Sequence, residues 1–298
     1  MKDYDYHLPT SLAEAVALKA ELGQRGRFVA GGTDVFILAK EGRFEFDALI
    51  SLRRVAEIKT IVEEGDNILI GSGVTISDLY KSELVAKQLP VLADAAAVMG
   101  CTQMRNVATI GGNVMNAAAS GDTLPPLLCL DTACRLVSAK GERLVPMTEM
   151  FLAPRKTAAE PDEALAGLVI PKPSAGGKKK SGAFIKLTRR AAMDLSIVSL
   201  AVQIQLDASL SKVEDARVAA GVVAPTPVRL PETERLLVGK PVEEAAVGEA
   251  ASCAKGECTP RNSLRGSQWY REEMICVLLP RAVRQALARL GVDLDQAA

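Results

Sequence analysis

The chain has 298 residues, and its 36 basic and 36 acidic side chains give a formal net charge of zero. A chain of this length buries a substantial core and is typical of two domains. The balanced charge argues against nucleic-acid and anionic-membrane binding, which favour a basic excess or patch. His7 is the only histidine, which argues against histidine-rich metal sites and serine–histidine nucleophiles.

Targeting and metal signals are absent from the sequence. The N-terminus is polar and lacks the apolar region of a signal peptide, and no apolar stretch reaches the ~20 residues that span a bilayer. We therefore expect a cytoplasmic protein. The six cysteines include no C-x-x-C pair, and neither C-x₄-C pair has the further cysteines that a cluster or structural zinc needs. We expect buried cysteines and a few free thiols.

The N-terminal segment predicts a small βαβ-like unit. Ser11, with Glu14 three residues later, has the pattern of a capping box, and its helix is expected to end at Gly23. The apolar face of that helix is expected to contain Leu12, Ala15, Val16 and Ala20. The elements expected next are a strand over 27–30, a helix from its cap at Thr33 through Leu38 to a stop at Gly42, and a strand over 48–52.

A hairpin and several helices are expected from residue 58 onward. The hairpin strands are 58–62 and 68–70, and the helices are 75–81 and 84–99. The second double-glycine segment follows in a region of low helix propensity. The remaining elements of this half are an apolar helical turn after Pro125-Pro126 and strands over 134–139 and 143–146.

A Pro- and Gly-rich segment at 171–177 predicts a domain boundary. The basic run Lys178–Lys180 follows two glycines and is interpreted as a solvated linker. Beyond it we expect strands over 183–188, 197–206 and 213–222, then helices over 232–237, 242–254 and 268–290. A run of strands followed by a run of helices is typical of an α+β domain.

Two double-glycine segments are the main functional signal: Ala30-Gly31-Gly32-Thr33-Asp34 and Thr109-Ile110-Gly111-Gly112-Asn113. Glycine tolerates positive φ and lets backbone N–H groups approach a ligand, and successive N–H groups form an anion-binding nest. Either segment alone is more typical of a tight turn, but two that converge could hold a pyrophosphate. A third segment, Gly71-Ser72-Gly73, lacks the last glycine of a dinucleotide fingerprint and is interpreted as a structural turn.

The surroundings of these segments resemble a known family. Thr, Asn, Ser, Asp and Ala follow the second segment, and such side chains can hydrogen-bond a polyol chain. The resemblance is to the FAD-binding medium subunit of the molybdenum hydroxylases, which include xanthine dehydrogenase and carbon monoxide dehydrogenase. Besides the two glycine segments, it rests on Arg105-Asn106, Asp122-Thr123-Leu124-Pro125-Pro126-Leu127-Leu128, Lys186-Leu187-Thr188-Arg189-Arg190-Ala191-Ala192-Met193-Asp194 and Arg265-Gly266-Ser267-Gln268-Trp269-Tyr270-Arg271.

The resemblance spans nearly the whole chain and implies an α+β fold. Residues 1–174 would form a FAD-binding domain of the vanillyl-alcohol-oxidase (PCMH) type, made of two α/β subdomains at about 1–56 and 57–174. Residues 178–298 would form a C-terminal α+β domain, an antiparallel sheet with helices.

The resemblance also assigns cofactor contacts, while it assigns no catalytic or metal-ligating residue to this chain. One side of the FAD pyrophosphate would be lined by Val29, Ala30, Gly31, Gly32, Thr33, Asp34 and Val35. The other side would be lined by Thr109, Ile110, Gly111, Gly112, Asn113 and Asn116. The flavin and ribityl contacts would come from Asp122, Leu124 and Lys186.

Several of these residues have alternative interpretations. Asp122 also fits an Asx turn before the two prolines. Lys186 either lies at the pyrimidine edge of the flavin, where a cation raises the potential, or extends to solvent. The family often has an aromatic residue before this lysine, and Ile185 in its place puts aromatic shielding of the flavin in doubt. Asp34 is expected to point away from phosphate, to cap the helix or to hold the loop.

Other residues of the resembling segments have expected roles outside the cofactor contacts. Arg189-Arg190 would contact the adenine half of FAD or a partner subunit, or form a solvated turn. Arg105-Asn106 is expected to be structural. Trp269 and Tyr270 are expected to anchor the last helix.

The function implied is that of an electron-transfer flavoprotein subunit, an oxidoreductase. In the family, electrons pass from a molybdenum cofactor on a large subunit through two [2Fe–2S] clusters on a small subunit to FAD, and then to an acceptor, often NAD. The chain would therefore need both partners. Two alternatives are a self-contained flavin oxidase of the same fold superfamily and a cofactor-free assembly subunit. The lack of an acid–base constellation argues against the first, and the two intact glycine pairs argue against the second.

Overall fold

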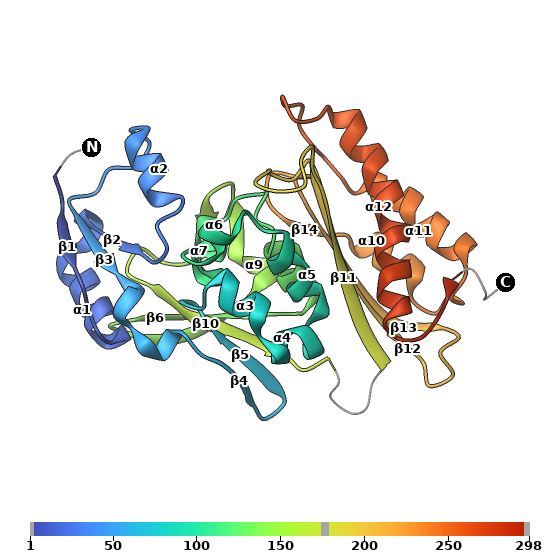
Figure 1. Cartoon of the computed structure of the whole chain (residues 1–298), viewed down its shortest axis with the longest axis horizontal. Coiled ribbons are helices and arrows are strands. Elements are labelled where there is room, and N and C mark those ends of the chain that lie inside the picture. The colour runs from blue at the N-terminus through green and yellow to red at the C-terminus, as the bar shows by residue number, and fades with distance from the viewer. Residues whose placement is uncertain (1–2, 174–178, 295–298) are drawn as a thin grey trace. The chain divides into compact units, whose positions relative to one another are not determined.

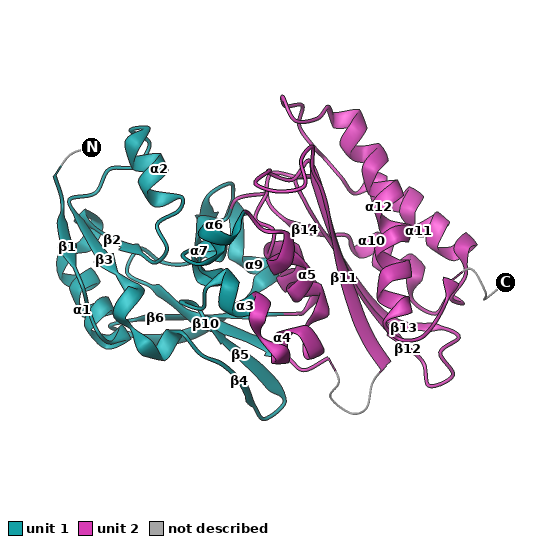
Figure 2. Ribbon diagram, viewed as in Figure 1, with its two compact units in different colours: residues 1–79, 101–117, 132–170 teal, residues 80–100, 118–131, 171–298 magenta. Residues whose placement is uncertain are grey.

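The computed structural model describes residues 3–173 and 179–294, and these form two compact units (Figures 1 and 2). Unit 1 comprises residues 1–79, 101–117 and 132–170, whereas unit 2 comprises 80–100, 118–131 and 171–298. Unit 2 thus includes two segments that precede the expected boundary. Residues 174–177 of that boundary, and Lys178, lie outside the described residues.

Unit 1 begins with a parallel sheet of three strands in the order β1–β3–β2. Its elements are β1 (Asp5–His7), α1 (Leu12–Leu22), η1 (Gly23–Arg25), β2 (Gly26–Val29), α2 (Val35–Lys40), β3 (Ala48–Ser51), η2 (Leu52–Arg54) and η3 (Ala56–Ile58), where η denotes a 3-10 helix. All of β3 is buried, as expected for the central strand of a covered parallel sheet. The predicted βαβ-like unit is confirmed.

The first helix confirms its predicted cap and corrects its predicted face. The Ser11 hydroxyl accepts from the Glu14 backbone N–H at 3.1 Å, which satisfies one otherwise unpaired donor of the first turn. The Glu14 carboxylate accepts from the Thr10 backbone N–H at 2.7 Å. Lys19 is buried and Ala20 is exposed, so the lysine takes the last position of the apolar face.

A second sheet of unit 1 has the order β4–β5–β10–β6–β7. Its strands are β4 (Ile61–Glu64), β5 (Asn67–Gly71), β6 (Ala133–Ser138), β7 (Gly141–Pro146) and β10 (Ala164–Pro171). The pair β4–β5 is antiparallel and forms the predicted hairpin, and the strands predicted over 134–139 and 143–146 pair in the same way as β6–β7. The remaining elements near this sheet are α3 (Ile76–Lys81), α6 (Thr102–Arg105), α7 (Ile110–Asn116), α9 (Met147–Met150), β8 (Phe151–Ala153) and β9 (Lys156–Thr157).

Three helix predictions need correction. Asp34, not Thr33, precedes the first residue of α2, and its side chain forms no capping bond. The helix expected over 84–99 is divided into α4 (Glu83–Gln88) and α5 (Pro90–Val98), because proline lacks an N–H and disfavours a helical residue before it. The second double-glycine segment lies in the first turn of α7 despite its low helix propensity.

Unit 2 is built on an antiparallel sheet in the order β11–β12–β13–β14. The strands are β11 (Lys179–Leu187), β12 (Val198–Leu206), β13 (Val213–Gly221) and β14 (Val228–Arg229). The helices besides α4 and α5 are α8 (Leu124–Cys129), α10 (Pro231–Leu237), α11 (Glu244–Gly256) and α12 (Gln268–Ala288). Helices cover both faces of this sheet (Figure 1), which explains why every residue of β12 is buried. The α+β prediction is confirmed.

The aromatic pair at the start of α12 divides between core and surface. Tyr270 is half-buried and packs against the core of unit 2, as predicted. Trp269 is 65% exposed, so the expectation that it anchors the helix is wrong. Within residues 3–173 and 179–294, no helix has the length and apolar content needed to cross a membrane.

All six cysteines are free thiols. Cys129, Cys134 and Cys258 are buried, and the other three are partly exposed. Burial raises the pKa of Cys134 and that of Cys258 to about 12, since an apolar environment disfavours the thiolate. The expectation of buried cysteines with a few accessible thiols is confirmed.

Candidate functional site

The first double-glycine segment contacts the residues that lead into the second, inside unit 1. A Cβ atom on Gly31 would lie 2.0 Å from the carbonyl oxygen of Val107 and 2.9 Å from the Cα of Ala108. These two residues lead directly into Thr109. Any side chain at position 31 would therefore separate the first segment from the second, and glycine is required because the neighbouring atoms are backbone atoms.

The second segment is held by a similar contact with the third glycine segment. A Cβ atom on Gly111 would lie 2.4 Å from the Cβ of Ser72, and the Gly111 N–H donates to the Ser72 carbonyl at 2.9 Å. A Cβ atom on Gly71 would in turn lie 2.1 Å from the carbonyl oxygen of Ile58. The interpretation of Gly71-Ser72-Gly73 as a structural turn therefore agrees with its close packing.

The N–H groups at the start of α7 already have acceptors within the chain. These acceptors are Val74 O for Ile110, Ser72 O for Gly111, Thr109 Oγ1 for Gly112 and Thr109 O for Asn113, at 2.9 to 3.0 Å. The Thr109 hydroxyl is thus the cap of the helix. The expected nest of free donors is not formed by the second segment, because acceptors from the β5–α3 connection and from Thr109 already bind these N–H groups.

Free donors occur instead in the first segment. The N–H groups of Gly32, Thr33 and Asp34 find no acceptor within the described residues. Gly32 has φ of +72°, a conformation that glycine adopts without strain. A short run of unpaired N–H groups beside a left-handed residue is the arrangement that binds anions.

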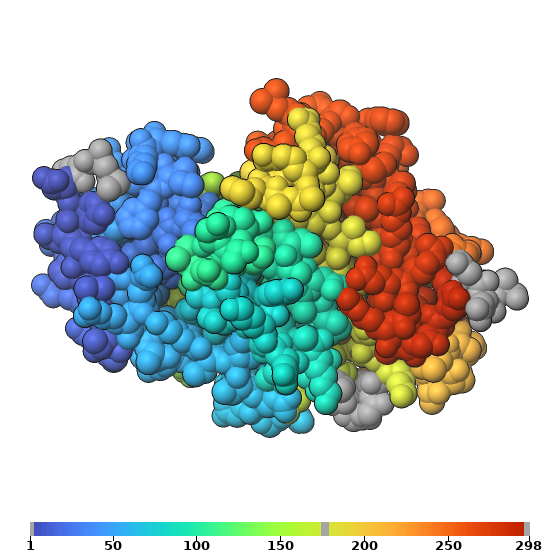
Figure 3. All heavy atoms as spheres, viewed as in Figure 1, coloured from blue at the N-terminus to red at the C-terminus, as the bar shows by residue number. Residues whose placement is uncertain are grey.

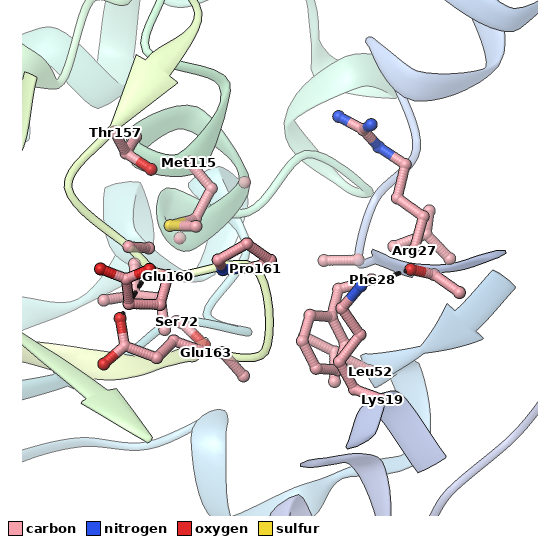
Figure 4. A pocket seen from close by; sticks show the side chains of 18 of the residues that line it. Lys19, Arg27, Phe28, Leu52, Ser72, Met115, Thr157, Glu160, Pro161 and Glu163 are labelled. Carbon is pink, nitrogen blue, oxygen red and sulfur yellow. Dashed lines mark hydrogen bonds between the residues drawn. The ribbon is translucent and has the colours of Figure 1, made fainter. Parts of the chain in front are cut away.

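A pocket of about 450 Å³ lies in unit 1 beside both segments (Figure 4). Its lining includes Val29 and Ala30 from the first segment and Gly111 and Gly112 from the second. A Cβ atom on Gly112 would touch only the Thr109 hydroxyl, at 3.0 Å, so this glycine leaves the pocket open. The predicted pyrophosphate contacts outside the lining are Gly31, Gly32, Thr33, Asp34, Val35, Thr109, Ile110, Asn113 and Asn116.

Cations lie on one side of the pocket. The Lys19 ammonium donates to the carbonyl oxygens of Gly23 and Gly26 at 2.7 and 2.6 Å, and burial lowers its pKa. The Arg27 guanidinium stacks 3.7 Å from the centre of the Phe44 ring, and burial lowers the pKa of this group as well. Lys19 was missed in the sequence, although its spacing from Leu12 and Ala15 along the helix could have indicated burial.

Carboxylates lie on the other side of the pocket (Figure 4). Glu163 accepts two bonds from Arg143, at 2.6 and 2.7 Å, and a third from the Glu160 backbone N–H at 2.7 Å. These bonds lower the pKa of Glu163, so the carboxylate is ionised at neutral pH. No spacing pattern in the sequence indicates this cluster, since Arg143 lies 20 residues away.

Asp122, Leu124 and Lys186 belong to unit 2, where the two charged residues form a buried ion pair. Their charged atoms are 2.7 Å apart, and both side chains are 6% exposed. Ser196 donates to the second carboxylate oxygen of Asp122 at 2.9 Å. Lys186 therefore does not extend to solvent, and the Asp122 carboxylate is engaged by these partners rather than by an Asx turn. Burial raises the pKa of Asp122, while Lys186 and Ser196 oppose that rise.

The other predicted residues have local roles. Asn106 accepts from the Ser77 hydroxyl at 2.5 Å and so joins its loop to α3, as the structural interpretation predicts. Asn116 accepts from Arg155 at 2.8 Å. Arg190 is exposed and pairs with Asp194 at 3.5 Å. Among the described residues, no group of three His, Cys, Asp or Glu side chains is arranged to hold a metal ion.

The Gly31 contact predicts that an added methyl group destabilises the protein at position 31 but not at position 248. Gly31→Ala should lower the free energy of unfolding by about 1–3 kcal/mol, because the backbone of Val107 yields less easily than a side chain. Gly248→Ala is the matched control, since its Cβ would meet nothing within 4 Å, and it should stabilise α11 by about 0.5–1 kcal/mol. Urea unfolding measures both, and equal effects of the two variants would contradict a tight contact at Gly31.

The buried ion pair predicts strong coupling between its members. Lys186→Met and Asp122→Asn each leave one buried charge without its partner, so each should cost about 3–5 kcal/mol of stability. The double variant should recover most of that loss. Urea unfolding of the four proteins gives the coupling energy, and additive losses would show that the two side chains act independently.

Two family models match consecutive parts of the chain. Residues 2–173 match the family model described as the FAD binding domain in molybdopterin dehydrogenase. Residues 183–286 match the CO dehydrogenase flavoprotein C-terminal domain.

Individual relatives cover almost the whole chain. The xanthine dehydrogenase FAD-binding subunit of Escherichia coli O157:H7 is 31% identical over 97% of this chain and 98% of the relative. The carbon monoxide dehydrogenase medium chain of Afipia carboxidovorans is 32% identical over 96% of this chain and 97% of its own length. A solved carbon monoxide dehydrogenase structure from Hydrogenophaga pseudoflava matches with a TM-score of 0.91 at 32% identity, over 97% of this chain and 98% of that chain. The chain therefore belongs to the FAD-binding, or medium, subunits of the molybdenum hydroxylase family, which are oxidoreductases.

Proposed function

We propose that this chain is the electron-transfer subunit of a molybdenum hydroxylase complex. It would take electrons from the [2Fe–2S] clusters of a partner subunit through FAD and pass them to an external acceptor such as NAD. The observation that carries the proposal is the contact of Gly31 with Val107, beside a pocket whose lining includes Ala30 from the first glycine segment and Gly111 and Gly112 from the second. When bound, FAD supplies the ability to accept single electrons and to release a pair.

The two glycine segments would hold the pyrophosphate in different ways. The N–H groups of Gly32, Thr33 and Asp34 have no acceptor within the described residues, so they can donate to phosphate oxygens in charge-assisted bonds. Gly111 and Gly112 would instead present a surface without side chains, because their own N–H groups are bonded within the chain. Lys19 and Arg27 add positive charge to the pocket that Ala30 and Gly112 also line.

The proposed flavin contacts are Asp122, Leu124 and Lys186. This assignment rests on the resemblance of the Asp122–Leu128 and Lys186–Asp194 segments to those of the family. Lys186 is paired with Asp122, so the two side chains together would bring little net charge to the flavin. Its expected role is therefore to position hydrogen-bonding groups at the flavin, rather than to raise the flavin potential as an unpaired cation would.

The proposed partners are a large molybdenum-cofactor subunit and a small [2Fe–2S] subunit. The carbon monoxide dehydrogenase relatives are themselves named medium chains, which supports an assembly of several subunits. In this chain, three of the six cysteines are buried, and their spacing does not fit a cluster. The clusters are therefore assigned to the partner.

The purified chain, reconstituted with flavin, should show a flavin absorption spectrum and should release FAD on denaturation. Gly112→Val should keep the fold and lower FAD affinity at least tenfold, because the new side chain enters open pocket space. Gly248→Val controls for the cost of valine within a helix. Gly111→Val is not suitable, since its side chain would collide with Ser72.

Three results would contradict parts of this proposal. Failure to bind FAD would exclude a flavoprotein role, and retention of FMN in place of FAD would exclude the pyrophosphate site. Turnover of an organic substrate with dioxygen by the isolated chain would instead favour a self-contained flavin oxidase.

A further inference from the structure

Unit 2 exposes large apolar side chains on two segments, 188–196 and 261–269. The exposed fractions are 97% for Leu264, 65% for Trp269, 61% for Met193 and 48% for Leu195. Single exposed apolar residues are normal, but a group of them at one place marks an interaction site. None of these four residues takes part in the proposed cofactor site.

The two segments lie side by side and form one surface, which we call the 193/264 surface. The Arg189 guanidinium donates to the carbonyl oxygen of Leu264. A Cβ atom on Gly266 would lie 3.0 Å from the side chain of Ile197, which follows the first segment. Figure 3 shows the corresponding yellow and orange-red atoms next to each other at the upper edge of unit 2.

A buried arginine holds this surface in place. Arg271 is 2% exposed and donates to the carbonyl oxygens of Ile197 and Val222, at 2.7 and 3.2 Å, and to the Ser263 hydroxyl at 2.7 Å. It thereby joins both segments to the end of β13. The two segments that carry the exposed apolar side chains are therefore held in place by the hydrogen bonds of Arg271.

The rim of the surface is positively charged. The two segments contain four arginines and one carboxylate, Asp194. Asp194 pairs with Arg190, whereas Arg261 and Arg265 form no ion pair within residues 3–173 and 179–294. Burial lowers the pKa of Arg271, and the charges of Arg261 and Arg265 lower it further. A partner that covers this rim must present an acidic face.

The first segment is connected at both ends to the buried ion pair. Lys186 is the second-last residue of β11, and Leu187 separates it from residues 188–196. Ser196, the last residue of the segment, donates to Asp122. A protein docked on the 193/264 surface would therefore rest on the loop that begins and ends at the pair proposed to contact the flavin.

A second copy of the chain is a poor occupant for this surface. In a symmetric dimer the same patch forms both halves of the contact, so the arginines of one copy would face those of the other. Like charges placed together in this way oppose association. An acidic partner that donates electrons fits this surface better, because it complements the basic rim and would dock next to the pair proposed to contact the flavin.

We propose that the 193/264 surface is the docking site for an acidic face of the iron–sulfur subunit. The proposal rests on the proposed electron-transfer function. A [2Fe–2S] cluster held by four thiolates is itself anionic, so arginines beside it would stabilise the encounter. An apolar centre within a charged rim suits a partner that must dock in one orientation close to the flavin.

The test places a photo-crosslinking amino acid at position 264 of this chain in the intact complex. Position 238 is the control. Val238 is also exposed, but it lies near the start of β13, because the N–H of the neighbouring Gly239 donates to the Val213 carbonyl. The control thus lies roughly 25–30 Å from the Val222 end of that strand. After irradiation, mass spectrometry should find the iron–sulfur subunit joined to position 264 at least tenfold more often than to position 238.

Crosslinks to the molybdenum subunit or to a second copy, equal yields at the two positions, or no product would overturn the proposal. The FAD content of the same complex, read from its absorption, tests the proposed function separately. Arg265→Glu gives a second measurement in the full complex. It should slow flavin reduction by the clusters at least tenfold without changing FAD content, and an unchanged rate would also overturn the proposal.

Discussion

The close approach of the Gly31 backbone to the carbonyl of Val107 determines how the candidate site is built. With no Cβ at position 31, the end of β2 can lie against the loop that leads into α7. The same principle acts twice more, where Gly111 packs on Ser72 and Gly71 on Ile58. Three backbone contacts, each dependent on a missing side chain, thus connect the first sheet of unit 1 to α7 and to the second sheet. Loops positioned by backbone contact can present N–H groups in a defined geometry.

These contacts give the two glycine segments different tasks. The N–H groups of the second segment are already bonded to acceptors from Ser72, Val74 and Thr109. This segment would therefore offer a ligand open space rather than hydrogen bonds. The first segment retains N–H groups without acceptors at positions 32–34 and therefore offers hydrogen bonds. A phosphate binds best where donors are not already committed. In the proposed site the pyrophosphate would therefore find donors on the first loop and clearance beside the second.

The sequence predicted the helices and strands better than it predicted the contacts between residues far apart in the chain. Hydrophobic periodicity located the strands of both units, and the Ser11 cap is confirmed because capping depends on residues three positions apart. The Lys186–Asp122 pair joins residues 64 positions apart, and no local pattern reports such a distance. The acceptors at α7 come from 36 to 39 residues upstream in the case of Val74 and Ser72, so the donors of that helix looked free in the sequence. Trp269 was misjudged because aromatic burial is a general tendency, and this side chain is 65% exposed.

Hydrogen–deuterium exchange with and without FAD tests the central claim, that the first segment supplies the donors and the second supplies the clearance. The account predicts that FAD binding slows exchange strongly at the amides of Gly32, Thr33 and Asp34. The amides of residues 110–113 should change little, because they are already bonded within the chain. Strong protection of 110–113 with unchanged exchange at 32–34 would contradict the account.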